Sequence, residues 1–120
     1  MESFDERIAQ LNKMIAEARR ITFFTGAGIS TGSGIPDFRS ADGLYTTSEE
    51  DNTEYMLSHT CLKMEPERFY EYLRKYMDFR AYKPNIAHLK ISELQRARNV
   101  SVITQNIDGL HEKAGSEVVD

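Results

Sequence analysis

Two short loops of this sequence carry residue types that suit a charged, hydrogen-bonding ligand. The first, Gly26-Ala27-Gly28, directly follows a β-branched and aromatic run. Missing side chains let backbone N–H groups approach phosphate oxygens, as a pyrophosphate site requires. The glycines at 26, 28 and 32 are spaced one residue longer than GxGxxG, and no second strand ending in an acid follows about 20 residues later. This disfavours an ordinary hydride-transfer enzyme, and a glycine turn without a ligand stays open.

The residues that follow, 35–39, read Ile-Pro-Asp-Phe-Arg and combine a rigid proline, a carboxylate, a large ring and a guanidinium. Arg39 can pair with a phosphate or carboxylate in a forked geometry. Phe38 can cover a planar ring or shield a reactive carbon from water. The alternative is that Phe38 fixes the loop to the core while Arg39 pairs with Asp37.

The second loop begins at Gln105-Asn106 and reaches Asp108 after an apolar run. Amides both donate and accept, so they suit ribose hydroxyls, and Asp108 can accept from a carboxamide NH₂. The alternative is ordinary turn chemistry at the end of a strand, for which Asn, Asp and Gly are the usual residues.

The surrounding pattern predicts the elements that position these loops. Apolar and β-branched runs at 21–25 and 100–104 predict two strands. Helical spacing predicts helices over 4–20, 66–79 and 84–98, with prolines 66 and 84 in the first turns, and 26–43 is expected to be mostly loop. This order is typical of an α/β protein with a parallel sheet, in which ligands gather at the carboxyl ends of strands. If the strands are neighbours, the two loops face one another across a crevice.

Composition narrows the function classes further. The 120 residues include 15 Lys and Arg against 19 Asp and Glu, a formal net charge of −4. Clustered positive charge is what nucleic-acid binding needs, so we expect no nucleic-acid partner. The sequence has no long apolar run and no basic-then-apolar start, so we expect no membrane partner and a cytoplasmic location. One cysteine, Cys61, predicts neither a disulfide nor a zinc site built from cysteine pairs, and it suits a small core position.

Together the motifs resemble the sirtuin family, the NAD-dependent protein deacylases. The matching segments are TGAGISTGSGIPDFRS at 25–40, KPNIAH at 83–88, TQNIDGLH at 104–111 and AGS at 114–116, in the family's order. The resemblance implies a Rossmann-like NAD-binding domain, here as an incomplete parallel sheet with an inserted helical segment at about 48–82. It also implies an acyl-lysine protein or peptide as substrate.

The resemblance further implies which residues contact NAD. Asn106 would support catalysis by ordering the ribose and nearby water. Phe38, Ile107 and Asp108 would surround the nicotinamide. The full set of implied cofactor contacts is Gly26, Ala27, Gly28, Thr31, Phe38, Arg39, Gln105, Ile107 and Asp108.

Two features of the sirtuin sequence pattern are missing from residues 1–120. The histidine base follows the Ala-Gly-Ser segment in the family, and no such histidine occurs up to Asp120. The cysteine pairs for structural zinc are absent too, so we predict no metal ligands and an amino-terminal, truncated part of a sirtuin that by itself does not complete deacylation. His59, His88 and His111 are expected to pack or cap rather than catalyse.

Two alternatives to a deacetylase stay open. One is a noncatalytic NAD-binding or interaction fragment from a truncated gene, and the other is a sirtuin-like NAD glycohydrolase or ADP-ribosyltransferase. Among acyl groups the sequence favours acetyl or another neutral group. Some relatives that remove acidic acyl groups carry Tyr-x-x-Arg, whereas Tyr70 is followed three positions on by Leu73.

Overall fold

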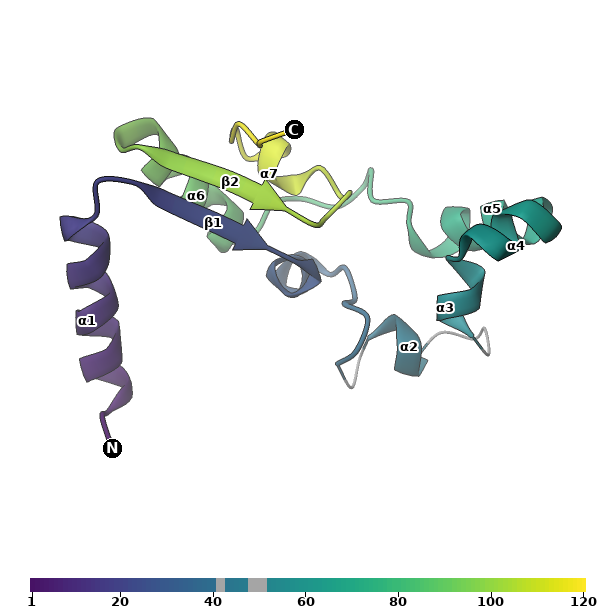
Figure 1. Cartoon of the computed structure of the whole chain (residues 1–120), viewed down its shortest axis with the longest axis horizontal. Helices are drawn as coiled ribbons and strands as arrows, with labels where there is room; N and C mark the ends of the chain where they lie inside the picture. Colours follow the sequence, from purple (N-terminus) through teal and green to yellow (C-terminus); the bar gives the residue numbers. More distant parts are fainter. Residues whose placement is uncertain (41–42, 48–51) are drawn as a thin grey trace.

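A two-stranded parallel sheet lies at the centre of the computed structural model, which describes residues 1–40, 43–47 and 52–120. Strand β1 (Ile21–Thr25) pairs with β2 (Val100–Thr104), with Ile21 opposite Val100 and Thr25 opposite Thr104. Both strands have the predicted bounds. Because they run in the same direction, their carboxyl ends meet at one edge, and the two loops of interest begin side by side (Figure 1).

The glycine-rich stretch after β1 is more regular than the sequence suggested. It forms a 3₁₀ helix, η1 (Ala27–Ser33), where mostly loop was expected. Gly34 ends this helix with φ of 94°, a left-handed conformation that disfavours residues with a Cβ, and its N–H donates to the Thr31 carbonyl at 3.0 Å. Most residues of this helix are small, and its tight winding brings Ser30 to the buried side.

Beyond the sheet lies a separate group of short helices (Figure 1). They are α2 (Leu44–Thr47), α3 (Thr53–Met56), α4 (His59–Met64) and α5 (Pro66–Tyr76). Met56, Cys61 and Tyr72 form their buried core, which confirms the predicted core role of Cys61. Of the expected helical insertion at about 48–82, residues 48–51 lie outside the described part, and its status as an insertion stays a prediction.

Helix α6 (Ile86–Ala97) leads into β2, and α7 (Leu110–Lys113) follows it. Asn85 caps α6, so Pro84 precedes the cap and does not open the helix as predicted. The buried face holds His88, Ile91 and Ser92, whereas the apolar residues Ile86 and Leu89 stay 68% and 47% exposed. Tertiary packing therefore selects a face that hydrophobicity alone does not indicate.

Helix α1 (Phe4–Glu17) ends three residues before the predicted bound and projects away from the sheet (Figure 1). None of its residues is buried. Its carboxyl end is held by the Arg98 guanidinium, which donates to the carbonyls of Ile15 at 2.5 Å and Ala18 at 2.6 Å. A 14-residue helix is marginal in water on its own, so this contact and the Ser3–Glu6 capping box at its other end both contribute to its order.

We expect Arg98→Ala to loosen α1 selectively. The change removes charge-assisted hydrogen bonds that contribute on the order of 1–3 kcal/mol. Amides of α1 should exchange about tenfold faster or more in hydrogen–deuterium exchange, while those of β1 and β2 keep their protection. Arg96→Ala is the matched control, because Arg96 donates to Ser92 within α6. Equal effects of the two substitutions on α1 would contradict this role.

Candidate functional site

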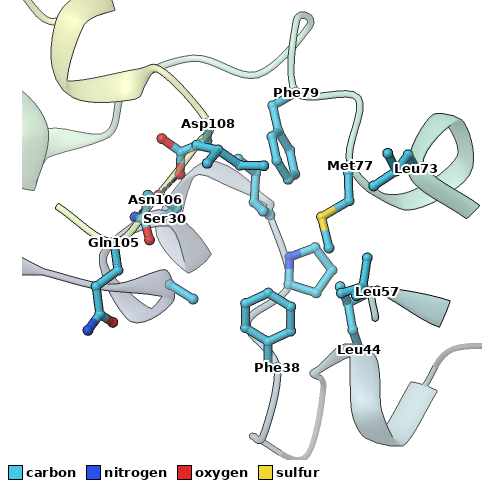
Figure 2. A pocket seen from close by; sticks show the side chains of 14 residues that line it. Ser30, Phe38, Leu44, Leu57, Leu73, Met77, Phe79, Gln105, Asn106 and Asp108 are labelled. Atoms are coloured by element: carbon cyan, nitrogen blue, oxygen red, sulfur yellow. Dashed lines mark hydrogen bonds between the residues drawn. The ribbon is translucent and has the colours of Figure 1, made fainter. Parts of the chain in front are cut away.

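A cavity of about 240 Å³ opens where the two strands end and the helical group begins (Figure 2). One part of its wall is polar and comes from η1 and the loop after β2: Ser30, Gln105, Asn106 and Asp108. The other part is apolar and includes Phe38, Leu44, Leu57, Leu73, Met77 and Phe79. Pockets for drug-sized ligands span roughly 300–1,000 Å³, so this one suits a single ring-sized group.

Direct hydrogen bonds join the two loops at the polar wall. Asn106 Nδ2 donates to the Gly26 carbonyl at 2.9 Å, and Ser30 Oγ donates to Asp108 Oδ2 at 2.5 Å. A Cβ added at Gly26 would lie 3.3 Å from Gln105 Oε1, so the backbone approaches this loop closely. The two loops are therefore joined directly by hydrogen bonds at the polar wall.

The Asp108 carboxylate is fixed through both of its oxygens. Ser30 Oγ donates to Oδ2, and the Leu110 N–H donates to Oδ1 at 3.0 Å. Gly109, with φ of 71°, turns the chain directly into α7 after this residue. Each carboxylate oxygen can accept more than one hydrogen bond, so the fixed group keeps capacity for a ligand donor.

The structure gathers most, but not all, of the predicted site residues at the cavity. Those that line it are Ala27, Phe38, Gln105, Asn106, Ile107 and Asp108. Gly26 contributes its carbonyl to Asn106, and a Cβ added at Gly28 would meet nothing within 4 Å. Thr31 and Arg39 lie elsewhere: Thr31 donates to the Gly28 carbonyl at 3.0 Å, and Arg39 lies 5.6 Å from the centre of the Tyr45 ring.

Of the alternative arrangement for the 35–39 loop, the pair between Arg39 and Asp37 is not observed. Asp37 accepts hydrogen bonds from Ser40, and its carbonyl accepts from the Leu44 N–H at 2.7 Å. Phe38 lies 5.7 Å from the Tyr45 ring, between centroids, while it also lines the cavity (Figure 2). This loop therefore presents Phe38 to the cavity from a short, hydrogen-bonded turn.

Sequence reasoning missed Ser30 and most of the apolar wall, of which it had singled out only Phe38 and Leu73. Ser30 is 1% exposed and bonds Asp108 across 78 positions of sequence. Its place in the glycine-rich motif was a usable signal, because one 3₁₀ turn brings residue 30 back beside residue 27. Leu57 and Met77 gave no such signal, because they only follow the last turns of α3 and α5.

Two histidines lie buried beside the site and not in its wall. His88 on α6 and His111 on α7 are 0% and 1% exposed, with ring centroids 5.0 Å apart. Burial lowers the pKa of both imidazoles from 6.5, and the neighbouring His111 lowers the pKa of His88 further. Asp108 raises both pKa values and Glu112 raises that of His111, without reversing the direction.

These shifts predict that the chain loses stability in mild acid. Below about pH 6.5 the unfolded histidines take up protons that the folded ones do not, so the free energy of unfolding falls as the pH decreases toward the folded pKa values. Urea unfolding at several pH values measures this slope. His88→Gln should flatten the slope below pH 6.5, because it removes one of the two buried imidazoles. A flat wild-type profile would refute the prediction.

Comparison with known proteins defines the class that this fold and cavity represent. The Sir2 family profile matches residues 26–120. The chain therefore belongs to the Sir2 family, as the sirtuin resemblance predicted. The match contains both loops, the helical group and the two buried histidines.

Individual relatives agree with this assignment. The chain is 52% identical over 110 residues to an NAD-dependent protein deacetylase of Listeria monocytogenes, which covers 92% of this chain and 47% of that protein. It is 46% identical over 117 residues to one of Clostridium acetobutylicum, covering 95% and 48%. The chain thus spans about half the length of the curated relatives it matches.

Solved structures support the fold. A structure described as Sir2 with p53 peptide and NAD⁺ superimposes with a TM-score of 0.80 at 34% identity, covering 94% of this chain and 44% of that one. A structure described as Sir2 bound to acetylated peptide gives a TM-score of 0.78 at 33% identity, with 94% and 44% coverage. The α/β arrangement of the parallel strands and helices is consistent with part of a Rossmann-like fold.

Neither a metal centre nor a membrane span emerges from the described residues. Across 1–40, 43–47 and 52–120, no three His, Cys, Asp or Glu side chains gather closely enough to hold a metal ion. The one cysteine, Cys61, is enclosed in the helical core. These residues therefore do not fit the structural zinc that the family resemblance implies. No helix in the same ranges has the length and apolar character to cross a bilayer.

Proposed function

We propose that this chain binds NAD and forms the nicotinamide side of an NAD-dependent protein-lysine deacetylase site. In that activity the acyl group moves from lysine to ADP-ribose and nicotinamide is released. The observation that carries the proposal is that the glycine-rich turn after β1 and the amide-rich turn after β2 are hydrogen-bonded to each other beside one ring-sized cavity. The names of the relatives support it.

The cavity matches the chemistry of a nicotinamide. Its volume, about 240 Å³, accommodates the ring and not the whole dinucleotide, so the phosphates would lie outside it. Asp108 would accept from the carboxamide NH₂, while Phe38 and Ile107 provide apolar contact. The turn from Gly26 to Thr31, exposed at Gly28 and Thr31, would face the phosphates, with Arg39 beyond it.

The chain's own residues would prepare the site for reaction. NAD, when bound, supplies a ribose carbon that accepts the acyl-lysine oxygen as nicotinamide leaves. Asn106, anchored through Nδ2, keeps its Oδ1 to order a ribose hydroxyl or a water molecule. The apolar wall, which includes Leu44 and Phe79, would exclude bulk water from the ribose carbon, which develops positive charge in the reaction.

The acyl-lysine substrate proposed here is a neutral one. Leu73 lines the apolar wall, whereas Tyr70 is 50% exposed and does not. An acidic acyl group reaching Leu73 would leave its carboxylate unpaired, which disfavours succinyl-lysine. The proposed protein or peptide partner is therefore acetylated or similarly neutral, and the proposed location is the cytoplasm, without nucleic-acid or membrane partners.

Binding and turnover are tested separately. NAD⁺ binding is measured on this chain by calorimetry, and turnover on the protein that carries it, with acetyl-lysine and succinyl-lysine peptides. Production of O-acetyl-ADP-ribose supports the deacetylase. Nicotinamide release without that product indicates a glycohydrolase, and binding without any turnover indicates a noncatalytic NAD-binding protein. Absence of NAD⁺ binding would refute the proposal.

A further inference from the structure

The buried histidines His88 and His111 have no part in the nicotinamide contacts proposed above, yet they come from α6 and α7 to meet behind the loops. Their rings meet edge to face, at 74°. Among the described residues, His88 Nε2 and His111 Nδ1 have no hydrogen-bond partner, although both side chains are fully enclosed. Buried polar atoms are almost always paired, so these two require an explanation.

Hydrogen bonds at the opposite ring atoms fix the His88 tautomer. The Asn85 N–H donates to His88 Nδ1 at 3.1 Å, so this nitrogen carries a lone pair. In the neutral ring the proton then sits on Nε2. His88 therefore presents an unused N–H donor.

The same reasoning fixes His111. Its Nε2 lies 2.9 Å from Thr25 Oγ1, and Thr25 Oγ1 gives its own hydrogen to Thr104 Oγ1 at 2.8 Å. Thr25 can therefore only accept from His111, which puts the proton on Nε2 and leaves a lone pair on Nδ1. The unused atom of His111 is an acceptor, complementary to the unused donor of His88.

From His111 the hydrogen bonds continue to the site. Thr104 Oγ1, which receives the Thr25 hydrogen, also accepts from the Asn106 N–H at 3.1 Å. The Asn106 side chain in turn holds the Gly26 carbonyl. One connected series thus runs from His111 to the residue that joins the two loops.

We propose that His88 and His111 are positioning residues: His88 Nε2–H donates to His111 Nδ1 through one bridging water molecule, and this pairing holds Thr25, Thr104 and Asn106 in place. The effect on a reaction rests on the proposed function, whereas the hydrogen-bonded series itself does not. Protonating His111 would place two donors face to face and break the pairing. The charged groups that face the pair, Asp108 and Glu112, favour that protonation.

The first test needs no substitution. ¹⁵N-detected NMR of the imidazoles in this chain at neutral pH should find both rings neutral with the proton on Nε2, and the shift of His111 Nδ1 should be that of a hydrogen-bonded acceptor. A His111 ring protonated on Nδ1 would overturn the proposal. So would a Nδ1 shift typical of a bare lone pair.

The second test uses two substitutions of opposite chemistry. His88→Asn keeps an acceptor near the Nδ1 position, for the Asn85 cap, but lacks the distal donor. His88→Gln keeps a donor near Nε2 and loses the cap. We expect about tenfold faster exchange of the Asn106 amide and a moved His111 Nδ1 resonance in His88→Asn, with both largely restored in His88→Gln.

The opposite order, in which His88→Asn is the milder change, would show that His88 only caps and packs, and would overturn the proposal. Equal effects of the two would do the same. If either variant fails to fold, the NMR measurement of the His88 and His111 tautomers in the unsubstituted chain still tests the proposal. No step of these tests requires NAD, so failure of the proposed function and failure of the histidine pairing are distinguished.

Discussion

Asp108→Asn should weaken NAD⁺ binding by about 10- to 100-fold, the loss expected for one hydrogen bond to a charged group. The carboxylate is already oriented by Ser30 and the Leu110 N–H, so it is preorganised to accept a further donor. Asparagine keeps the shape and one oxygen, which can still accept from Leu110. Its NH₂ group, placed where Oδ2 was, would confront the carboxamide NH₂ of the ligand, whereas the Ser30 hydroxyl can turn to accept from it. Calorimetry measures the change.

ADP-ribose, which lacks nicotinamide, separates this contact from general damage. Its affinity should change less than threefold or so in Asp108→Asn, because the lost contact is to the missing ring. Glu93→Gln is the matched control, since it removes one negative charge from the exposed face of α6, where Glu93 pairs with Lys90. Equal losses for NAD⁺ and ADP-ribose would mean that Asp108 supports the fold and does not contact nicotinamide.

Gly43→Ala should displace the loop that carries Phe38. A Cβ at this position would lie 2.7 Å from the carbonyl carbon and oxygen of Phe38 and 2.8 Å from Asp37 Oδ1. The neighbouring backbone is held by the bond from the Tyr45 N–H to the Phe38 carbonyl at 2.9 Å, so little of this clash can relax locally. We expect the free energy of unfolding to drop on the order of 1–3 kcal/mol, measured by urea denaturation.

Gly28→Ala is the control for that experiment. A Cβ there meets nothing within 4 Å, so the stability should change by no more than about 0.5 kcal/mol. If Gly43→Ala lowers the free energy of unfolding as little as Gly28→Ala does, the loop is not closely packed around residue 43. A lowered NAD⁺ affinity in Gly43→Ala would further link the position of Phe38 to binding.

The elements with strong local signals were predictable from the sequence. β1 and β2 consist of β-branched and aromatic residues between helical segments, and both bounds were correct. That the loops after β1 and β2 face one another was also predictable, because parallel neighbouring strands end at the same edge of a sheet. The Asn106 bond to the Gly26 carbonyl is the contact that realises this facing.

Features that depend on tertiary contacts were not predictable in the same way. The buried face of α6 carries the polar His88 and Ser92 beside Ile91, so the periodicity of apolar residues alone does not identify this face. The helix η1 is stabilised by hydrogen bonds between small residues that also favour turns. The apolar wall of the cavity needs Leu57 and Met77 to approach Phe38 across long stretches of chain, and no local pattern encodes that distance.

A crystal structure of the chain with NAD⁺ tests the assignment of the cavity most directly. We expect the nicotinamide ring between Phe38 and Ile107, its carboxamide within hydrogen-bond distance of Asp108, and the phosphates beside the Gly26–Gly28 turn. A nicotinamide lying outside this cavity, with the Ser30 and Asp108 side chains still paired and free of ligand, would contradict it.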